Sequence, residues 1–186
     1  MFKMLNKLSI VIISMLVVCI TNIAYAYSLN DVKQDYHRFK IKEESYTADS
    51  GQVMHSRYGK IMTLKTDAAD IVELNFYLGE LNEKKYVTVI ASFYGDSWML
   101  MNRLTIGDGT NAYDLYPNEK PTRMLEGRHT SERMKFYLLG NDYATFNKWK
   151  NAKIIRVKGD SLYSEYEIDP AEYTAVMDVI QKYLFE

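Results

Sequence analysis

A polar turn directly after an apolar run offers a serine in a position suited to nucleophilic attack. The sequence Gly-Asp-Ser at 95–97 follows an apolar run at 86–94, and Glu126 and His129 come further along the chain. A serine hydroxyl attacks an acyl carbon when a histidine removes its proton, an acid holds the histidine and hydrogen-bond donors stabilise the oxyanion. The sequence Gly-Asn-Asp at 140–142 is a candidate for those donors. Together these residue types suit ester hydrolysis.

The Gly-Asp-Ser sequence resembles the nucleophile block of the SGNH (GDSL) esterases, with Ser97 as nucleophile and His129 as base. That family has a residue between the glycine and the asparagine of its donor block, uses aspartate as the acid, and places the histidine block last. Here Gly140 directly precedes Asn141, the acid is Glu126, and His129 comes before Asn141. The family also uses a parallel sheet with crossover helices, whereas this chain predicts hairpins. A serine hydrolase is therefore an alternative function, which a helix in place of a strand after the turn would favour.

Local spacing does not indicate a metal site. His37, His55 and His129 stand apart in polar stretches, without an H-x-H or H-E-x-x-H pattern or a pairing with cysteine. The sequence Asp-Gly-Thr-Asn at 108–111 lacks the alternating acids and the final glutamate of a calcium loop. We therefore expect no metal and no cofactor, and we interpret 108–111 as a turn.

Aromatic side chains suggest a second kind of site. The chain has 16 tyrosines, which together with Trp98 and Trp149 are able to line a groove for a glycan or a peptide. Tyrosine is also a good strand residue, because its ring packs while its hydroxyl stays in water. A glycan or peptide binding module is thus a further alternative, and it requires an exposed concave aromatic face.

Alternation of apolar and polar residues predicts an antiparallel sheet. Stretches 71–78 and 132–139 each direct every second side chain to a buried face. The run 86–94 is apolar on both faces and predicts a central strand. After the Gly-Asp-Ser turn, a second apolar run at 98–106 and a short strand at 112–116 continue this meander.

Capping residues predict the helices. Ser28 is suited to cap a short N-terminal helix, although 36–42 is equally compatible with an edge strand. Asp142 precedes a helix predicted at 143–151, and Asp169, followed by proline, begins a C-terminal helix. The apolar stripe of this last helix is Tyr173, Val176, Met177, Ile180 and Leu184.

A hairpin is predicted just before the C-terminal helix. Strands at 154–158 and 162–168 flank Gly-Asp at 159–160, and a two-residue turn there sets Val157 opposite Leu162. Basic side chains of the first strand then share the outer face with acidic side chains of the second. Cross-strand ion pairs on a solvated face are the expected result.

The N-terminal segment 1–26 has the features of a secretory signal peptide. Lys3 and Lys7 precede an apolar run at 8–20, and Ala-Tyr-Ala at 24–26 offers a cleavage site after Ala26. The apolar run is short compared with the roughly 20 residues that cross a bilayer, which disfavours an uncleaved anchor. A lipoprotein signal at the only cysteine is also disfavoured, because a bulky valine precedes it.

Cleavage would leave a single domain at 27–186, exported to the periplasm or the extracellular space and not integral to the membrane. Cys19 lies in the signal, so this domain has no cysteine, and its 21 basic and 24 acidic side chains are interspersed. No basic tract suggests nucleic acid as a partner. About 160 residues suffice for a packed core, since a domain of this size buries roughly 70% of its unfolded surface.

A set of residues in the central and C-terminal parts carries a second resemblance. It comprises an apolar strand into Trp98, Ile106, Asp108-Gly109 with Tyr113 and Leu115, Glu132 leading into Tyr137-Leu138, a short helix, and Ala152-Lys153 with Arg156, Gly159 and Tyr163. This pattern resembles a module of small exported bacterial proteins of unassigned function. The resemblance implies an exported α+β domain and supplies no site residues.

The sequence thus predicts an α+β fold with a mainly antiparallel meander sheet of about six to eight strands, a short helix, a C-terminal hairpin and an amphipathic C-terminal helix. The predicted function is non-enzymatic, namely the binding of a protein or an envelope component by an exported protein. The alternatives are a small extracytoplasmic SGNH-like hydrolase using Ser97 and His129, and a glycan or peptide binding module.

Overall fold

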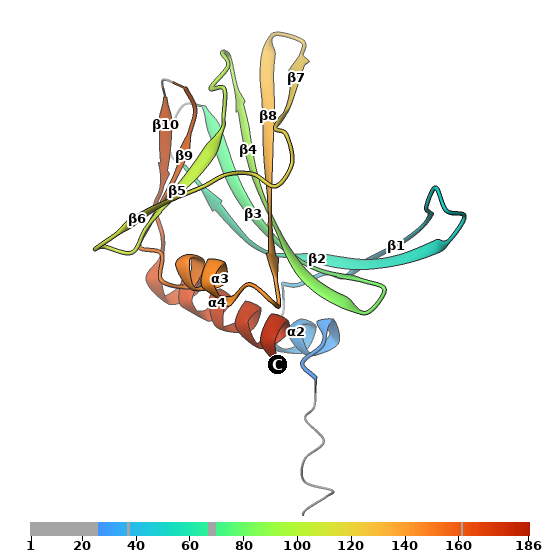
Figure 1. The fold of residues 1–186 in the computed structure, drawn as a ribbon. Helices are drawn as coiled ribbons and strands as arrows, with labels where there is room; N and C mark the ends of the chain where they lie inside the picture. Colours follow the sequence, from blue (N-terminus) through green and yellow to red (C-terminus); the bar gives the residue numbers. More distant parts are fainter. Residues whose placement is uncertain (1–25, 37, 67–69, 161) are drawn as a thin grey trace, which may run out of the picture.

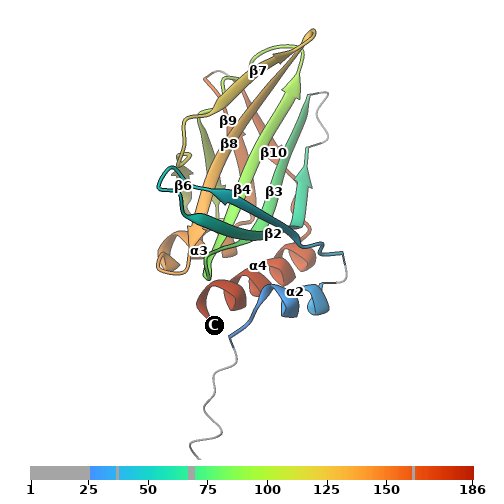
Figure 2. The same cartoon turned by 90° about the vertical axis from the view of Figure 1, so that its right-hand side faces the viewer.

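The computed structural model describes residues 26–36, 38–66, 70–160 and 162–186 (Figures 1 and 2). The predicted signal peptide, except for Ala26, and His37 therefore lie outside the described residues. The helices are α2 (Leu29–Asp35), α3 (Tyr143–Lys150) and α4 (Pro170–Phe185). The strands are β1 (Lys42–Thr47), β2 (Val53–Lys65), β3 (Ile71–Leu81), β4 (Lys84–Gly95), β5 (Arg103–Gly107), β6 (Ala112–Leu115), β7 (Thr122–Glu126), β8 (His129–Leu139), β9 (Ile154–Lys158) and β10 (Tyr163–Tyr166).

The described strands form two antiparallel sheets. A six-stranded sheet has the order β1-β2-β3-β4-β8-β7, and a four-stranded sheet has the order β10-β9-β5-β6. The predicted α+β class, the mainly antiparallel pairing and the C-terminal helix are confirmed. The predicted single sheet of about six to eight strands is wrong only in number, because the described residues form ten strands that divide between two sheets.

The core lies between the two sheets, and α3 and α4 close one end of it (Figure 1). Alternate residues of β3 turn inward, as predicted for this stretch, and Phe76 is fully buried. Trp149 of α3 is also fully buried, with its ring edge-on to Phe76 at a centroid distance of 5.6 Å. Helix α4 buries the predicted stripe and adds Tyr183, whose hydroxyl donates a 2.8 Å hydrogen bond to the carbonyl of Gly79.

The predicted hairpin between 86–94 and 98–106 is wrong. Strand β4 pairs with β3 and β8, whereas β5 pairs with β6 and β9, so residues 96–102 carry the chain from one sheet to the other. Residues 98–102 form neither a strand nor the alternative helix. The physical reason is Glu132, which is fully buried and accepts hydrogen bonds from three consecutive backbone amides of this crossover. Amides held by a carboxylate are not available to pair with a strand.

A bend in β2 turns the β1–β2 hairpin away from the rest of the six-stranded sheet (Figure 1). Strand β2 pairs with β1 over Val53–Tyr58, and its pairing with β3 shifts register between Lys60 and Met62. A β-bulge of this kind bends a strand and increases its twist. Gly59, beside the bulge, leaves room for the chain at Lys40, whose carbonyl would lie 2.4 Å from a Cβ added there. We call this projecting hairpin the β1–β2 arm.

The C-terminal hairpin forms with a different register from the predicted one. Tyr163 pairs with Lys158, and the amide of Gly159 donates to the carbonyl of Leu162, so the connection is four residues long. Gly159 lets the hairpin lie close to the crossover segment 96–102, since a Cβ on this residue would be 1.9 Å from the carbonyl oxygen of Met99. The shift is by two residues, so the side chains of β9 and β10 keep their predicted faces, whereas Leu162 lies in the connection and is exposed. The expected outward ion pair is present between Arg156 and Glu165.

The predicted helix starts at Ser28, Asp142 and Asp169 are confirmed. The hydroxyl of Ser28 accepts from the amide of Asp31, and the Asp31 carboxylate accepts in return from the amide of Ser28. Asp142 and Asp169 each accept from amides in the first turn of their helices. These side chains satisfy donors that a helix N-terminus leaves unpaired.

Candidate functional site

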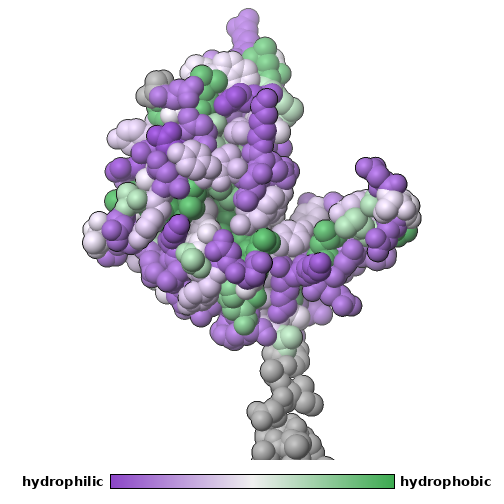
Figure 3. All heavy atoms as spheres, in the orientation of Figure 1, coloured by the Kyte–Doolittle hydropathy of each residue, from purple (hydrophilic) through white to green (hydrophobic). Residues whose placement is uncertain are grey.

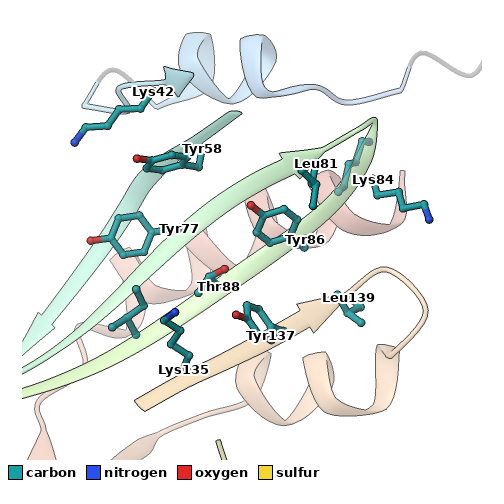
Figure 4. A pocket seen from close by; sticks show the side chains of 12 residues that line it. Lys42, Tyr58, Tyr77, Leu81, Lys84, Tyr86, Thr88, Lys135, Tyr137 and Leu139 are labelled. Atoms are coloured by element: carbon teal, nitrogen blue, oxygen red, sulfur yellow. The ribbon is translucent and has the colours of Figure 1, made fainter. Parts of the chain in front are cut away.

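The outer face of the six-stranded sheet is hollowed into a groove of about 730 Å³. Figure 3 shows the hollow as an open notch between the β1–β2 arm and the neighbouring strands, and Figure 4 shows its side chains. The twelve lining residues are Lys42, Tyr58, Tyr77, Leu81, Lys84, Lys85, Tyr86, Thr88, Ile90, Lys135, Tyr137 and Leu139. We call this surface the tyrosine–lysine groove.

Strand register places the lining side chains in rows across the sheet. In one row Tyr58 pairs with Gly79, Gly79 with Tyr86, and Tyr86 with Leu139. Since side chains alternate between the two faces of a strand, all members of this row lie on the same outer face. The bend in β2 brings Tyr58 in from the side, which makes the face concave.

A second row lies beside the first. Tyr77 pairs with Thr88, and Thr88 pairs with Tyr137. Two residues further along β4, on the same face as Thr88, Ile90 pairs with Lys135 of β8. Tyr77, Thr88, Ile90 and Tyr137 are all half-buried, so each gives part of its surface to the floor of the groove.

Gly79 allows the ring of Tyr86 to lie across β3. A Cβ added to Gly79 would be 2.3 Å from the Cζ atom of Tyr86, which is well inside contact distance. The missing side chain therefore makes the space that the ring occupies. A flat aromatic surface in the middle of the groove is the result.

Two of the groove tyrosines are held by glutamates at its rim. The hydroxyl of Tyr58 donates a 2.5 Å hydrogen bond to Glu44, and the hydroxyl of Tyr137 donates to Glu119. These hydrogen bonds raise the pKa of Tyr58, and raise the pKa of Tyr137 to about 12. The hydrogen bond from Tyr137 lowers the pKa of the Glu119 carboxyl. Both phenols are therefore neutral at physiological pH.

The other two groove tyrosines have free hydroxyls. Within the described part of the chain, no protein group forms a hydrogen bond with the hydroxyl of Tyr77 or of Tyr86. Burial raises the pKa of Tyr77, so its hydroxyl keeps its proton. Each of these hydroxyls is available as a hydrogen-bond donor to a molecule in the groove.

All four charged side chains that line the groove are lysines, although the whole chain has 24 acidic and 23 basic side chains. Lys135 forms an ion pair with Glu119 at 3.3 Å, and Lys85 lies over the ring of Tyr183 at 5.4 Å. Lys42 and Lys84 form no ion pair with any described residue. Figure 4 shows Lys84 pointing away from the tyrosines, while Lys42 and Lys135 lie with them.

The structure does not link the residues of the alternative hydrolase by hydrogen bonds. His129 Nδ1 lies 2.8 Å from Asp96 Oδ1, and the hydroxyl of Ser97 has no hydrogen bond to any described residue. Ser97 instead uses its backbone carbonyl, which accepts from the Thr130 hydroxyl. Asn141 follows the far end of β8, roughly 30 Å from His129 at the usual rise of a strand. Among the described residues, the hydroxyl of Ser97 is therefore not hydrogen-bonded to His129, and Asn141 lies at the other end of β8 from both.

The tryptophans named with the tyrosines lie outside the groove. Trp149 is fully buried in the core, and Trp98 belongs to the crossover at the other end of β4. Sequence reasoning named aromatic residues as candidates but did not identify the lysines, or Tyr58, Tyr77, Tyr86 and Tyr137 as a set. Tyr77 was detectable, because it occupies the polar face of a clearly alternating strand. Tyr58 was not, because the bulge beside it changes the alternation.

The described residues offer neither a metal-binding cluster nor a membrane-spanning helix. No group of three or more histidine, cysteine, aspartate or glutamate side chains among them is placed to hold a metal ion. None of the described helices has the length and apolar character needed to cross a membrane.

Comparison with models of protein families, with curated proteins and with solved structures finds no match to this chain. A function must therefore be inferred from the chemistry of the groove itself.

Proposed function

We propose that this protein is a non-enzymatic, exported binding protein whose ligand lies in the tyrosine–lysine groove. One observation carries the proposal. Five neighbouring strands direct tyrosine and lysine side chains into a single concave surface, and several of these donors have no partner within the described chain. Export is inferred from the features of residues 1–26.

The opposite outer face of the molecule shows what a solvated sheet face looks like in this protein. On the four-stranded sheet, Arg103 pairs with Asp114 at 3.2 Å and Arg156 pairs with Glu165. Charges there are mixed and neutralise one another. The groove instead collects charge of one sign on an aromatic surface, which is the composition of binding sites more than of ordinary surface.

A site-directed photo-crosslinker tests whether the groove is occupied. Thr88→Cys introduces a single thiol at the centre of the groove, since 27–186 contains no cysteine. Purified protein labelled there with a benzophenone maleimide is irradiated with envelopes of the cells that produce it. Tyr163→Cys, at an exposed position on the other sheet, is the matched control.

We expect saturable adducts from Thr88→Cys that excess unlabelled wild-type protein suppresses and excess Tyr86→Ala does not. Adducts from Tyr163→Cys should be fewer and unaffected by either competitor. Adducts of equal yield from both positions, or adducts that wild-type protein fails to suppress, would show that the groove is not a binding site.

An activated-ester probe tests the hydrolase alternative. We expect no labelling of the purified protein at Ser97, because no described histidine contacts its hydroxyl. Covalent labelling that disappears in Ser97→Ala would contradict the non-enzymatic proposal.

A further inference from the structure

We propose that the ligand of the tyrosine–lysine groove is an acidic polysaccharide. This inference rests on the proposed binding function and adds the chemical class of the ligand. It is carried by the charge of the groove, by its flat aromatic surfaces, and by the way the strands beneath it use their backbone hydrogen bonds.

The positive charge of the groove determines the sign of the charge expected on the ligand. The lining contains lysines and no carboxylate, and Lys42 has no ion-pair partner among the described residues. Two acids beside the lining, Glu44 and Glu119, accept hydrogen bonds from the hydroxyls of Tyr58 and Tyr137. A concave surface with charge of one sign attracts ligands of the opposite sign. The groove therefore favours an anion.

Ring placement indicates flat, partly apolar units in that anion. The ring of Tyr86 lies across Gly79, and Tyr77 lies half-buried on the neighbouring row. Rings held against a sheet present their faces to solvent, and a pyranose ring has an apolar C–H face that stacks on such a surface. Tyrosine combines this contact area with a hydroxyl at low cost in conformational entropy.

The groove offers hydrogen-bonding partners for the hydroxyl groups of a sugar. Tyr77 and Tyr86 offer hydroxyls that no described residue uses, and Thr88 lies between the tyrosine rows. Lys42 lies beside Tyr58 and Lys135 lies beside Tyr137 (Figure 4), and an ammonium group in the lining is suited to a carboxylate or a sulfate. A chain of anionic sugars would thus meet aromatic faces, donors and cations together.

Backbone hydrogen bonding disfavours an extended peptide in the same place. Strands β3 and β4 have paired neighbours on both sides, and β8 pairs with β4 along the groove. The free edge of β8 at this level is already occupied, because Asn118 donates to the carbonyl of Lys135 and accepts from the amide of Tyr137. A peptide that binds by adding a strand needs a free edge. The floor of the groove, made by β3, β4 and β8, provides none, so side chains make the contacts there, and the edge strand β1 borders the groove at one side only.

The test uses defined probes and purified 27–186. Oligogalacturonate, oligoalginate and a chondroitin sulfate oligosaccharide represent acidic glycans, and calorimetric titration measures binding. Methyl-esterified oligogalacturonate keeps the sugar and removes the charge, whereas poly-L-glutamate keeps the charge on a peptide. Variants Tyr86→Ala and Lys42→Ala alter the groove, and Tyr163→Ala on the other sheet is the control.

We expect at least one acidic glycan to bind, with added salt weakening the interaction. Tyr86→Ala should lose about tenfold in affinity and Lys42→Ala about fivefold, while Tyr163→Ala binds as wild type does. Glu119→Gln should bind more tightly, because it removes the carboxylate that neutralises Lys135. A gain of affinity cannot result from misfolding.

Three results would overturn the inference: binding of none of the acidic glycans, equal binding of the methyl ester, or equal binding of poly-L-glutamate. Each is distinguishable from failure of the binding function itself. Competed crosslinking from Thr88→Cys would persist if the groove has a ligand of another class, and would be absent if the groove has none.

Discussion

The backbone amide of Met99 donates a 2.7 Å hydrogen bond to the carboxylate of Glu132 inside the core. The amides of Leu100 and Met101 donate to the same carboxylate at 2.9 Å, and Arg123 lies 3.2 Å from it. One buried side chain of the six-stranded sheet thus holds the segment that leads to the four-stranded sheet. Leu100 adopts a positive φ of 56°, which helps its neighbours turn their amides toward the carboxylate.

Glu132→Ala is expected to destabilise the fold by about 3–5 kcal/mol, because it leaves three backbone amides without an acceptor and removes the ion-pair partner of Arg123. Chemical denaturation followed by circular dichroism measures the change in the free energy of unfolding. Glu126→Gln, an exposed change on β7, is the matched control and should be nearly neutral. A Glu132→Ala protein as stable as this control would show that the crossover is held by other contacts.

Gly79→Ala is expected to displace the ring of Tyr86, since the new methyl group would overlap it. Such overpacking costs about 1–3 kcal/mol. The double variant Gly79→Ala/Tyr86→Ala removes the overlap, so its loss should be smaller than the sum of the two single losses. Additive losses in this cycle, measured by denaturant unfolding, would contradict the stacked arrangement.

Tyr137 should ionise at unusually high pH. Its hydrogen bond to Glu119 raises its pKa to about 12, against an ordinary value of roughly 10. The stability that this raised pKa contributes is fully present when the pH is below the tyrosine pKa of the unfolded chain. It is lost as the pH rises through the pKa of Tyr137 in the folded protein. NMR titration of labelled tyrosine, with Tyr137→Phe to assign the signal, measures the pKa. In Glu119→Gln we expect it to fall toward 10, and an unchanged pKa would exclude Glu119 as its cause.

Glu119 should contribute stability in the opposite pH range. Its pKa is lowered in the folded state by the hydrogen bond from Tyr137. Its contribution is therefore present above the ordinary glutamate pKa and is lost as pH falls through the folded value. Comparing acid unfolding of wild type and Tyr137→Phe checks this sign. The two curves should converge at low pH, and a constant separation would refute the linkage.

Ile180→Asp is expected to unfold the protein, because Ile180 is fully buried on α4 and the new charge would lack a partner. Ile180→Val is the conservative comparison and should cost about 1 kcal/mol. Thermal unfolding distinguishes the two. A cooperative transition near the wild-type temperature for Ile180→Asp would mean that α4 does not cover the core.

Sequence patterns correctly predicted the features that depend on residues close together in the chain. The alternation that buries Phe76 and the caps at Ser28 and Asp169 depend on neighbours in sequence, and each forms as expected. The division into two sheets depends on Glu132, a polar residue in an apolar strand that contacts a segment about 30 residues earlier. No spacing rule reveals that its carboxylate is buried, so the crossover was mistaken for a strand.

The groove shows the same limit. Tyr77 and Tyr86 occupy outward positions of predicted strands, but their adjacency follows from register and from the absence of a side chain at Gly79. Lys42 and Lys135 lie more than ninety residues apart in sequence, and the assembled sheet places both in the lining of one groove. Such convergence is a property of the assembled sheet.

The β-bulge next to Gly59 is the joint between the β1–β2 arm and the rest of the six-stranded sheet. Beyond it the β1–β2 arm joins the body mainly along one strand, so the local twist at that joint fixes how far Tyr58 and Lys42 stand from the opposite wall. Substitutions at the bulge, which is not among the lining residues, would therefore change the width of the proposed binding site.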